Sequence, residues 1–190
     1  MHSHDEMRQR NRKLRAALTP AKLLLAAESL ASRIVELEAY RDAQRVAVYF
    51  AVNGEIGLDP VIDHALAAGK QVYLPNLDQQ SLRFSPYFRE QRMRINKFRL
   101  PEPDVGDDAM LQPAQLELVL APLVVFDERR NRIGMGGGFY DRSFAMRKDP
   151  EVLQPVLVGV AHELQKVDEI LPEDWDVRLD MFVTDKSIYR

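Results

Sequence analysis

Runs of almost purely apolar residues, separated by helix-forming segments, constrain the fold of this chain more than any other feature. Strands that are apolar on both faces are typical of parallel sheets whose two faces are covered by helices. The runs are residues 45–52, 71–75, 116–122 and 154–161. We therefore predict an α/β fold: a single three-layer domain with a mostly parallel central sheet flanked by helices.

Cap residues mark two of the helices that separate these strands. Thr19 and Pro20 suit the N-cap and the first helical position, and apolar residues then recur at helical spacing through residues 20–39. Asp59-Pro60 opens a second helix in the same way, and Gly69 closes it. A strand, a helix and a strand within about 30 residues form a βαβ unit, whose right-handed crossover makes the two strands parallel.

Other segments are less regular. We expect strands at residues 82–88 and 179–184, a helix at residues 139–147, and a continuation of the strand at 116–122 as far as Phe126. The acidic stretch 102–108 reads as a solvated loop. At the amino end, residues 1–5 read as disordered and the strongly basic residues 8–15 as a helix.

Composition narrows the functional classes. A chain of 190 residues is long enough for one domain with a full core, so we expect residues 1–190 to form a single domain. The absence of cysteine excludes disulfides, thiolate metal sites and cysteine nucleophiles. The net charge of −3 predicts no general attraction to nucleic acid or to an anionic membrane. No run is long enough for a membrane span, and the basic start does not resemble a signal peptide, so we expect a cytoplasmic protein.

A glycine-rich stretch at residues 131–142 is the strongest candidate for a functional site. Four of the nine glycines of the chain lie between Gly134 and Gly138, with Arg132 before them and Asp141 after them. Backbone N–H groups of such a loop can bind an anion, the arginine can neutralise phosphate, and the aspartate can bind a hard cation. The stretch matches neither the P-loop pattern nor G-x-G-x-x-G. A nucleotide-phosphate loop with a magnesium ligand and a tight surface turn are both compatible with the glycines alone.

Several other side chains complete the list of candidates. Glu55 follows the strand at 45–52, at the edge where open α/β sheets bind ligands, and a carboxylate there suits the N–H groups of a heterocycle. Asp180 stands at the start of the last strand, where a second carboxylate can meet Asp141. The histidines His64 and His162 have no metal-ligand spacing and read as structural or surface residues.

The glycine stretch also carries a resemblance to a known family. Residues 132–142, RIGMGGGFYDR, closely resemble the signature of 5-formyltetrahydrofolate cyclo-ligase, also called methenyltetrahydrofolate synthetase. The similarity extends in the expected order over RAALTP at 15–20, NGE at 53–55, LP at 74–75, KFRLPEP at 97–103, LAPL at 120–123, FD at 126–127, WD at 175–176 and VT at 183–184. The resemblance implies ATP- and Mg²⁺-dependent conversion of 5-formyltetrahydrofolate to 5,10-methenyltetrahydrofolate, with release of ADP and phosphate.

The resemblance also implies roles for individual residues. The segment 1–18 would pack on the ATP site, and Arg132, Tyr140 and Asp141 would be catalytic. Asp141 and Asp180 would bind Mg²⁺. The folate would contact Phe50, Glu55, Phe98 and Tyr140. The ATP would contact Arg12, Arg15, Arg132, Ile133, Gly134, Met135, Gly136, Gly137, Gly138, Phe139 and Tyr140.

The chain departs from the family pattern at three positions. Asn11 stands where the family often has lysine, Gly137 where many relatives have lysine, and Phe98 where some have tryptophan. Two alternatives remain: an ATP-dependent kinase or ligase with another small substrate, and a nucleic-acid module that uses the basic residues 8–15. The absence of a recognition motif disfavours nucleic acid. We expect a monomer whose partners are ATP and 5-formyltetrahydrofolate, without nucleic acid or membrane.

Overall fold

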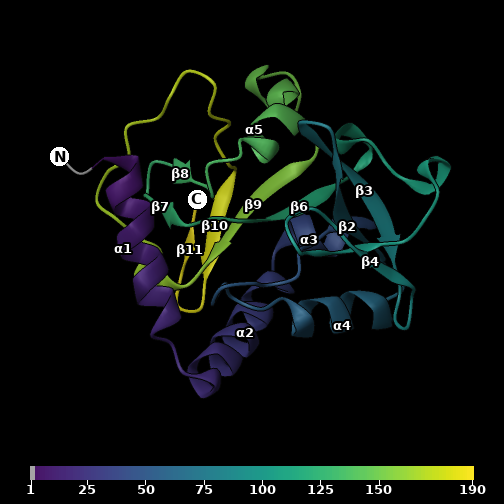
Figure 1. Ribbon diagram of the computed structural model, residues 1–190, viewed down its shortest axis with the longest axis horizontal. Helices are drawn as coiled ribbons and strands as arrows, with labels where there is room; N and C mark the ends of the chain where they lie inside the picture. Colours follow the sequence, from purple (N-terminus) through teal and green to yellow (C-terminus); the bar gives the residue numbers. More distant parts are fainter. Residues whose placement is uncertain (1–2) are drawn as a thin grey trace.

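The computed structural model describes residues 3–190 and contains the predicted mostly parallel sheet (Figure 1). Seven strands lie in the order β11-β10-β9-β6-β1-β2-β3. The five inner strands are parallel, and the edge strands β3 and β11 pair antiparallel with β2 and β10. These strands are β1 (Arg45–Ala47), β2 (Gln71–Asp78), β3 (Ser81–Tyr87), β6 (Leu118–Pro122), β9 (Val156–Ala161), β10 (Met181–Thr184) and β11 (Ile188–Tyr189).

Helices and two small hairpins surround this sheet. The helices are α1 (His4–Ala16), α2 (Pro20–Ile34), α3 (Glu38–Asp42), α4 (Asp59–Ala67) and α5 (Phe139–Ser143). The hairpins pair β4 (Met93–Ile95) with β5 (Pro101–Pro103), and β7 (Val125–Phe126) with β8 (Arg132–Ile133). Single 3-10 turns occur at Asp107–Ala109, Pro113–Gln115, Ala145–Lys148 and Glu163–Gln165. No helix within residues 3–190 combines the length and apolarity of a membrane span.

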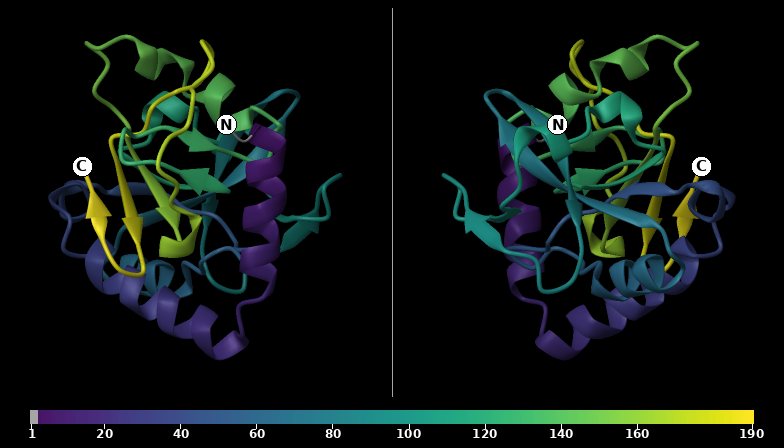
Figure 2. Two further views of the ribbon diagram at one scale, coloured as in Figure 1. Left: turned by 90° about the vertical axis from the view of Figure 1, so that its left-hand side faces the viewer. Right: turned by 90° about the vertical axis from the view of Figure 1, so that its right-hand side faces the viewer.

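The two faces of the sheet bury separate apolar layers. On one face, Leu30 and Ile34 of α2 and Val61 of α4 pack over the strands, and this cluster accounts for the apolar stripes of these helices. On the other face, Phe144 and Phe182 pack under α5 and the carboxyl-terminal loops. The views in Figure 2 show α2 and α4 below the sheet, and Figure 1 shows α1 at one end of the molecule. The fold class is therefore confirmed.

Several of the predicted boundaries are wrong, and three of them concern the segments before the glycine-rich stretch. The helix expected at residues 20–39 is two helices, because Leu37 adopts an extended conformation and buries its side chain. The strand that starts at Arg45 pairs only to Ala47, after which the chain bends away toward a cavity. The strand expected to run on to Phe126 stops at Pro122, which has no N–H to continue a ladder, and β7 joins a different hairpin.

Further differences concern the ends of the chain and the acidic stretch. The helix expected at 139–147 ends at Ser143 and a 3-10 turn follows, and β11 comes after the expected last strand. Helix α1 begins at His4, where Ser3 and Glu6 form a capping box, so Ser3 to Asp5 are ordered. Met1 and His2 lie outside the described residues. Glu102 is 3% exposed and therefore does not belong to a solvated loop.

The close contact between Gly159 of β9 and Phe182 of β10 gives a test of this packing. A Cβ at position 159 would overlap the ring of Phe182. We expect Gly159→Ala to lower the free energy of unfolding by about 1–3 kcal/mol, the usual cost of overpacking a core. Gly106→Ala is the matched control, because a Cβ there meets nothing within 4 Å. Urea denaturation of both variants measures the effect, and equal stability of the two would contradict the packing.

Candidate active site

The main cavity opens at the carboxyl ends of three parallel strands. Its volume is about 730 Å³. Phe50 and Glu55 follow β1, Leu77 lies at the end of β2, and Pro122 ends β6, and all four side chains line the cavity. Open α/β sheets bind ligands at this edge, because the strand ends leave unpaired backbone groups and the connecting loops diverge there.

The glycine-rich stretch forms one wall of this cavity. All residues from Arg132 to Asp141 line it. Gly136 has φ +95° and Gly138 has φ +62°, which are conformations that favour glycine. Arg142 holds the loop in place, since its Nη2 donates to the Gly137 carbonyl oxygen and its Nε to the Gln80 carbonyl oxygen, both at 2.6 Å. The loop is therefore a fixed part of the cavity wall.

Phe139 explains why a side chain at position 137 would be accommodated poorly. A Cβ on Gly137 would lie 2.8 Å from the ring of Phe139. The same ring makes an edge contact with Phe98, with centroids 5.9 Å apart, and both rings line the cavity. The space that a lysine side chain would enter is thus filled by an aromatic pair that joins the glycine loop to the β4–β5 hairpin.

Arg132 and Asp141 form a close ion pair in the cavity wall. Arg132 Nη2 lies 2.9 Å from Asp141 Oδ1, and the two side chains are 5% and 15% exposed. The Val177 N–H also donates to Asp141 Oδ1, at 3.2 Å. Both hydrogen bonds use Oδ1, so Oδ2 can accept a cation. The acidic side chains of Glu173 and Asp176 reach the same cavity.

Asp180 does not meet Asp141. Its Oδ1 accepts a hydrogen bond from Arg147 Nη2 at 2.6 Å, and its Oδ2 accepts one from the Leu157 N–H at 2.7 Å. Asp180 precedes β10 and Leu157 lies near the start of β9, so the carboxylate stands at the amino ends of these strands, and it does not line the cavity. Within residues 3–190, no group of three or more acidic, histidine or cysteine side chains has an arrangement that could hold a metal.

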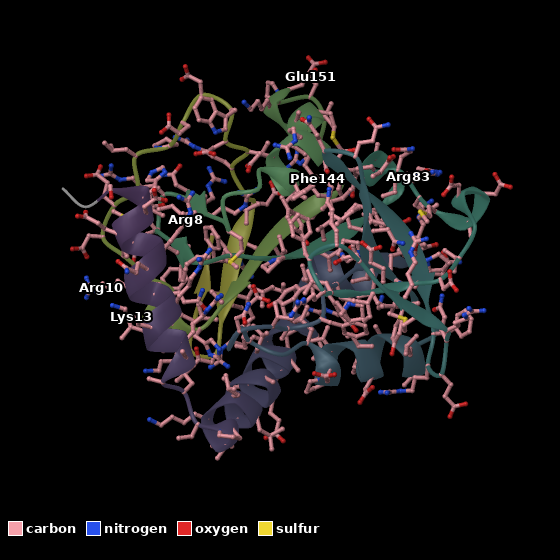
Figure 3. The ribbon with its side chains drawn as sticks, viewed as in Figure 1. Arg8, Arg10, Lys13, Arg83, Phe144 and Glu151 are labelled. Carbon is pink, nitrogen blue, oxygen red and sulfur yellow. The ribbon has the colours of Figure 1, made fainter. Side chains whose placement is uncertain are left out.

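The arginines of α1 divide into different environments. Arg8 lines the cavity, and its Nε donates to the Gly134 carbonyl oxygen at 2.9 Å. Arg12 is exposed, and its Nη2 contacts the sulfur of Met135 at 3.7 Å. Arg15 is 1% exposed and does not line the cavity. Figure 3 shows Arg8 on the side of α1 that faces the body of the molecule, and Arg10 and Lys13 on the outer side.

Arg8 and Arg12 are therefore the cations of α1 that contact the glycine loop, whereas Arg15 is buried and does not line the cavity. The spacing of Arg8, Arg12 and Arg15, at i, i+4 and i+7, placed them on one helical face, which is the sequence signal that could have identified Arg8. Asn11 is buried, and its side-chain amide donates to the Met7 carbonyl oxygen within the helix. With Arg8 and Arg15 turned inward, this helix also loses much of the basic surface that a nucleic-acid module would need.

Glu55 is a buried carboxylate that faces the cavity. Its side chain is 8% exposed, and its Oε2 accepts a hydrogen bond from the Val52 N–H at 3.1 Å. Burial raises the pKa of Glu55 above its ordinary value of 4.5, while the Val52 N–H and the charge of Arg15 oppose the shift. Burial also raises the pKa of Tyr140, whose ring lines the same cavity.

Three further residues, Asn96, Glu102 and Trp175, line the cavity although the sequence patterns assigned them no role in a site. Glu102 accepts hydrogen bonds through Oε1 from the Leu77 N–H and from Asn96 Nδ2, both at 2.9 Å. The Asn96 Oδ1 in turn accepts from the N–H groups of Phe98 and Leu100, so this network fixes the Phe98 loop. The only tryptophan, Trp175, also lines the cavity.

The predicted residues therefore fall into two groups. Phe50, Glu55, Phe98 and the whole segment from Arg132 to Asp141 line one cavity, whereas Arg12, Arg15 and Asp180 do not. His64 bonds the Tyr40 hydroxyl at 2.9 Å, away from the cavity. His162 is buried, and its Nε2 donates to the Gly54 carbonyl oxygen at 3.1 Å, directly before Glu55.

Comparisons with known proteins identify the family of this chain. The model of the 5-formyltetrahydrofolate cyclo-ligase family matches residues 1–185. The 5-formyltetrahydrofolate cyclo-ligase of Escherichia coli is 35% identical over 94% of this chain and 98% of its own length. The enzyme of that name from Haemophilus influenzae is 34% identical over 92% of this chain and 94% of its own length.

Solved structures share the fold. The 5,10-methenyltetrahydrofolate synthetase of Aquifex aeolicus superposes with a TM-score of 0.84 at 24% identity, covering 98% of this chain and 92% of its own. The corresponding enzyme of Mycoplasma pneumoniae gives a TM-score of 0.77 at 20% identity, covering 97% of this chain and all of its own. The chain belongs to the 5-formyltetrahydrofolate cyclo-ligase family.

Proposed function

We propose that this enzyme uses ATP and Mg²⁺ to cyclise 5-formyltetrahydrofolate to 5,10-methenyltetrahydrofolate, releasing ADP and phosphate. The observation that carries the proposal is a single cavity with two chemically different walls. The glycine loop and Arg8 supply N–H groups and positive charge at one wall, while Glu55 and Phe98 supply a carboxylate and an aromatic ring at the other. A volume of about 730 Å³ lies in the range of ligand pockets.

The chemistry requires activation of a poor leaving group. The γ-phosphoryl group of ATP is transferred to the formyl oxygen, which leaves ADP. The N10 amine of the same folate attacks the activated formyl carbon, and loss of phosphate and the N10 proton gives the methenyl bridge. Because the nucleophile is part of the substrate, the protein has to align the two substrates and neutralise phosphate charge.

The glycine loop and the nearby arginines suit the phosphate role. The backbone N–H groups of residues 134–138 would bind the phosphate oxygens, with Ile133, Met135, Phe139 and Tyr140 forming the wall around them. Arg132 and Arg8 would supply positive charge to the transferred group, where guanidinium groups form strong hydrogen bonds with phosphate. Arg12 lies beside Met135 at the rim and would approach the nucleotide from outside.

Asp141 is the residue best suited to hold Mg²⁺. Magnesium prefers oxygen ligands and is usually bound by one or two carboxylates together with substrate phosphates. The carboxylate of Asp141 lines the cavity beside the glycine loop, and Asp176 brings a second carboxylate to the same cavity. The ion would neutralise charge on the phosphate oxygens. Asp180, which is hydrogen-bonded to Arg147 and Leu157, would stabilise the fold and would not bind the metal.

The opposite wall suits a reduced pterin. The carboxylate of Glu55 would accept hydrogen bonds from the N–H groups of the ring, and Phe98 would cover its face. Phe50 and Tyr140 would complete the pocket, since both line the cavity. The edge contact between Phe98 and Phe139 supports this assignment, because transfer of a phosphoryl group requires the folate and the phosphates to bind side by side.

A direct assay tests the proposed function. Purified protein is incubated with ATP, Mg²⁺ and 5-formyltetrahydrofolate, and the near-ultraviolet absorbance of the methenyl product is followed, with ATP omitted as the control. We expect product only with ATP and Mg²⁺ present. Folded protein that binds ATP but forms no methenyl product would contradict the proposal and favour another small-molecule substrate.

Replacement of Asp141 tests the proposed metal ligand. We expect Asp141→Asn to lower kcat by roughly 100-fold or more, because it removes a charge that organises the transition state. Asp180→Asn is the control: it should lower thermal stability, since Arg147 and the Leu157 N–H lose their charged acceptor, but leave the Mg²⁺ concentration for half-maximal activity unchanged. Near-normal turnover of Asp141→Asn would remove Asp141 from the metal site.

The raised pKa of Glu55 predicts how folate binding depends on pH. An ionised Glu55 accepts hydrogen bonds from the pterin, and its carboxylate takes up a proton as the pH falls through a pKa that lies above 4.5. We therefore expect affinity for 5-formyltetrahydrofolate to decrease as the pH falls, and to begin decreasing at a higher pH than it would with an ordinary glutamate. Titration calorimetry measures this profile. Glu55→Gln should bind more weakly with a flat profile, and an unchanged profile in that variant would exclude Glu55 as the titrating group.

A further inference from the structure

Arg15 is the most unusual charged residue in the structure. It lies in the last turn of α1, and its side chain is completely buried, at 0% exposure. A buried guanidinium is costly unless charge and hydrogen bonds compensate it. Arg15 Nη1 donates to the Leu123 carbonyl oxygen at 3.3 Å, whereas Nε and Nη2 have no hydrogen-bond partner among residues 3–190. Its burial therefore calls for a nearby negative charge.

Glu55 supplies that charge from the cavity side. Arg15 Nη1 lies 3.7 Å from Glu55 Oε1. Glu55 lines the cavity and Arg15 does not, so the arginine stands behind the carboxylate, away from any bound ligand. Of the charged groups near Glu55, Arg15 is the cation that lowers its pKa. The pair is thus arranged with the negative charge toward the ligand and the positive charge beneath it.

The backbone around Glu55 also rests on this end of α1. Gly54 has φ +73°, and a Cβ added to it would lie 2.8 Å from the Arg15 carbonyl oxygen. On its other side, His162 Nε2 donates to the Gly54 carbonyl oxygen at 3.1 Å. The turn that carries Glu55 is therefore held between the end of α1 and His162.

We propose that Arg15 is a positioning residue for Glu55, and that it acts on folate binding and not on ATP. This inference rests on the proposed function, because it takes Glu55 as the pterin-binding carboxylate. Arg15 keeps that carboxylate ionised and aimed at the cavity. One helix then serves both substrates: Arg8 reaches the phosphate loop, and Arg15, about 10 Å further along the helix axis, supports the folate wall.

Matched variants of the two arginines separate these roles. Arg15→Met keeps the aliphatic volume and removes the charge. We expect it to raise the KM for 5-formyltetrahydrofolate about tenfold or more, the effect of losing an opposite charge beside a buried carboxylate, with the KM for ATP changed less than about twofold. Arg8→Met should show the reverse pattern. Arg15→Lys, which restores a positive charge, should recover most of the folate affinity.

A double variant tests whether Arg15 acts through Glu55. If it does, Arg15→Met combined with Glu55→Gln should have the same folate KM as Glu55→Gln alone, because the pair is a single functional unit. Effects that multiply would overturn the proposal. The double variant leaves no buried unpaired charge and is therefore expected to fold. If Arg15→Met does not fold, the double variant and Arg15→Lys still test the proposal.

The outcomes also distinguish this inference from the proposed function. Folded wild-type protein without cyclo-ligase activity would overturn the function itself. An active wild type in which Arg15→Met raises the KM for ATP, or changes neither KM, would overturn only the role assigned to Arg15.

Discussion

The parallel pairing of β1, β2 and β6 is the constraint on which the site depends. Parallel strands end at the same edge of a sheet. The segments that follow Ala47, Asp78 and Pro122 therefore all begin at this edge and separate from one another there. That divergence creates the cavity. It brings Glu55, the β4–β5 hairpin and the glycine loop together, although they lie far apart in the sequence.

Helix α1 supports each of the two walls of the cavity with a positively charged side chain. Its side chains at one helical face meet two different environments, because the helix crosses the end of the sheet and packs by Met7 against the β7–β8 hairpin. Arg8 meets carbonyl oxygen at the glycine loop, and Arg15 meets the buried Glu55. The helix thereby connects the glycine-loop wall to the Glu55 wall, which suits the proposed transfer of a phosphoryl group between two bound molecules.

Much of this arrangement could be predicted from local patterns. The apolar strands and the cap residues identified the parallel sheet, and the position of Glu55 after a strand placed it at the ligand-binding edge. The same argument applied to Asp180 would have placed it at the opposite edge, because it precedes a strand. The direction of the strands, and not the residue type, separates these two carboxylates.

Other features depend on tertiary contacts that no local pattern contains. The burial of Arg15 depends on how α1 packs against the β7–β8 hairpin. Arg12 lies on the same helical face but remains exposed, so the helical pattern alone does not distinguish the two arginines. Glu102 belongs to an acidic stretch, but its partners are the Leu77 N–H and Asn96, contributed by other strands and loops. The family resemblance assigned Arg15 to phosphate, but it did not indicate that this side chain is buried and lies 3.7 Å from Glu55.

Our central proposal is that a single cavity binds both substrates and that α1 supports its two walls through different arginines, Arg8 and Arg15. A crystal structure with Mg²⁺, a non-hydrolysable ATP analogue and 5-formyltetrahydrofolate tests it most directly. We expect the γ-phosphate to lie against residues 134–138 and Arg8, the pterin to lie against Glu55 and Phe98, and Arg15 to remain buried behind Glu55. Phosphate bound directly to Arg15, or folate bound outside this cavity, would contradict it.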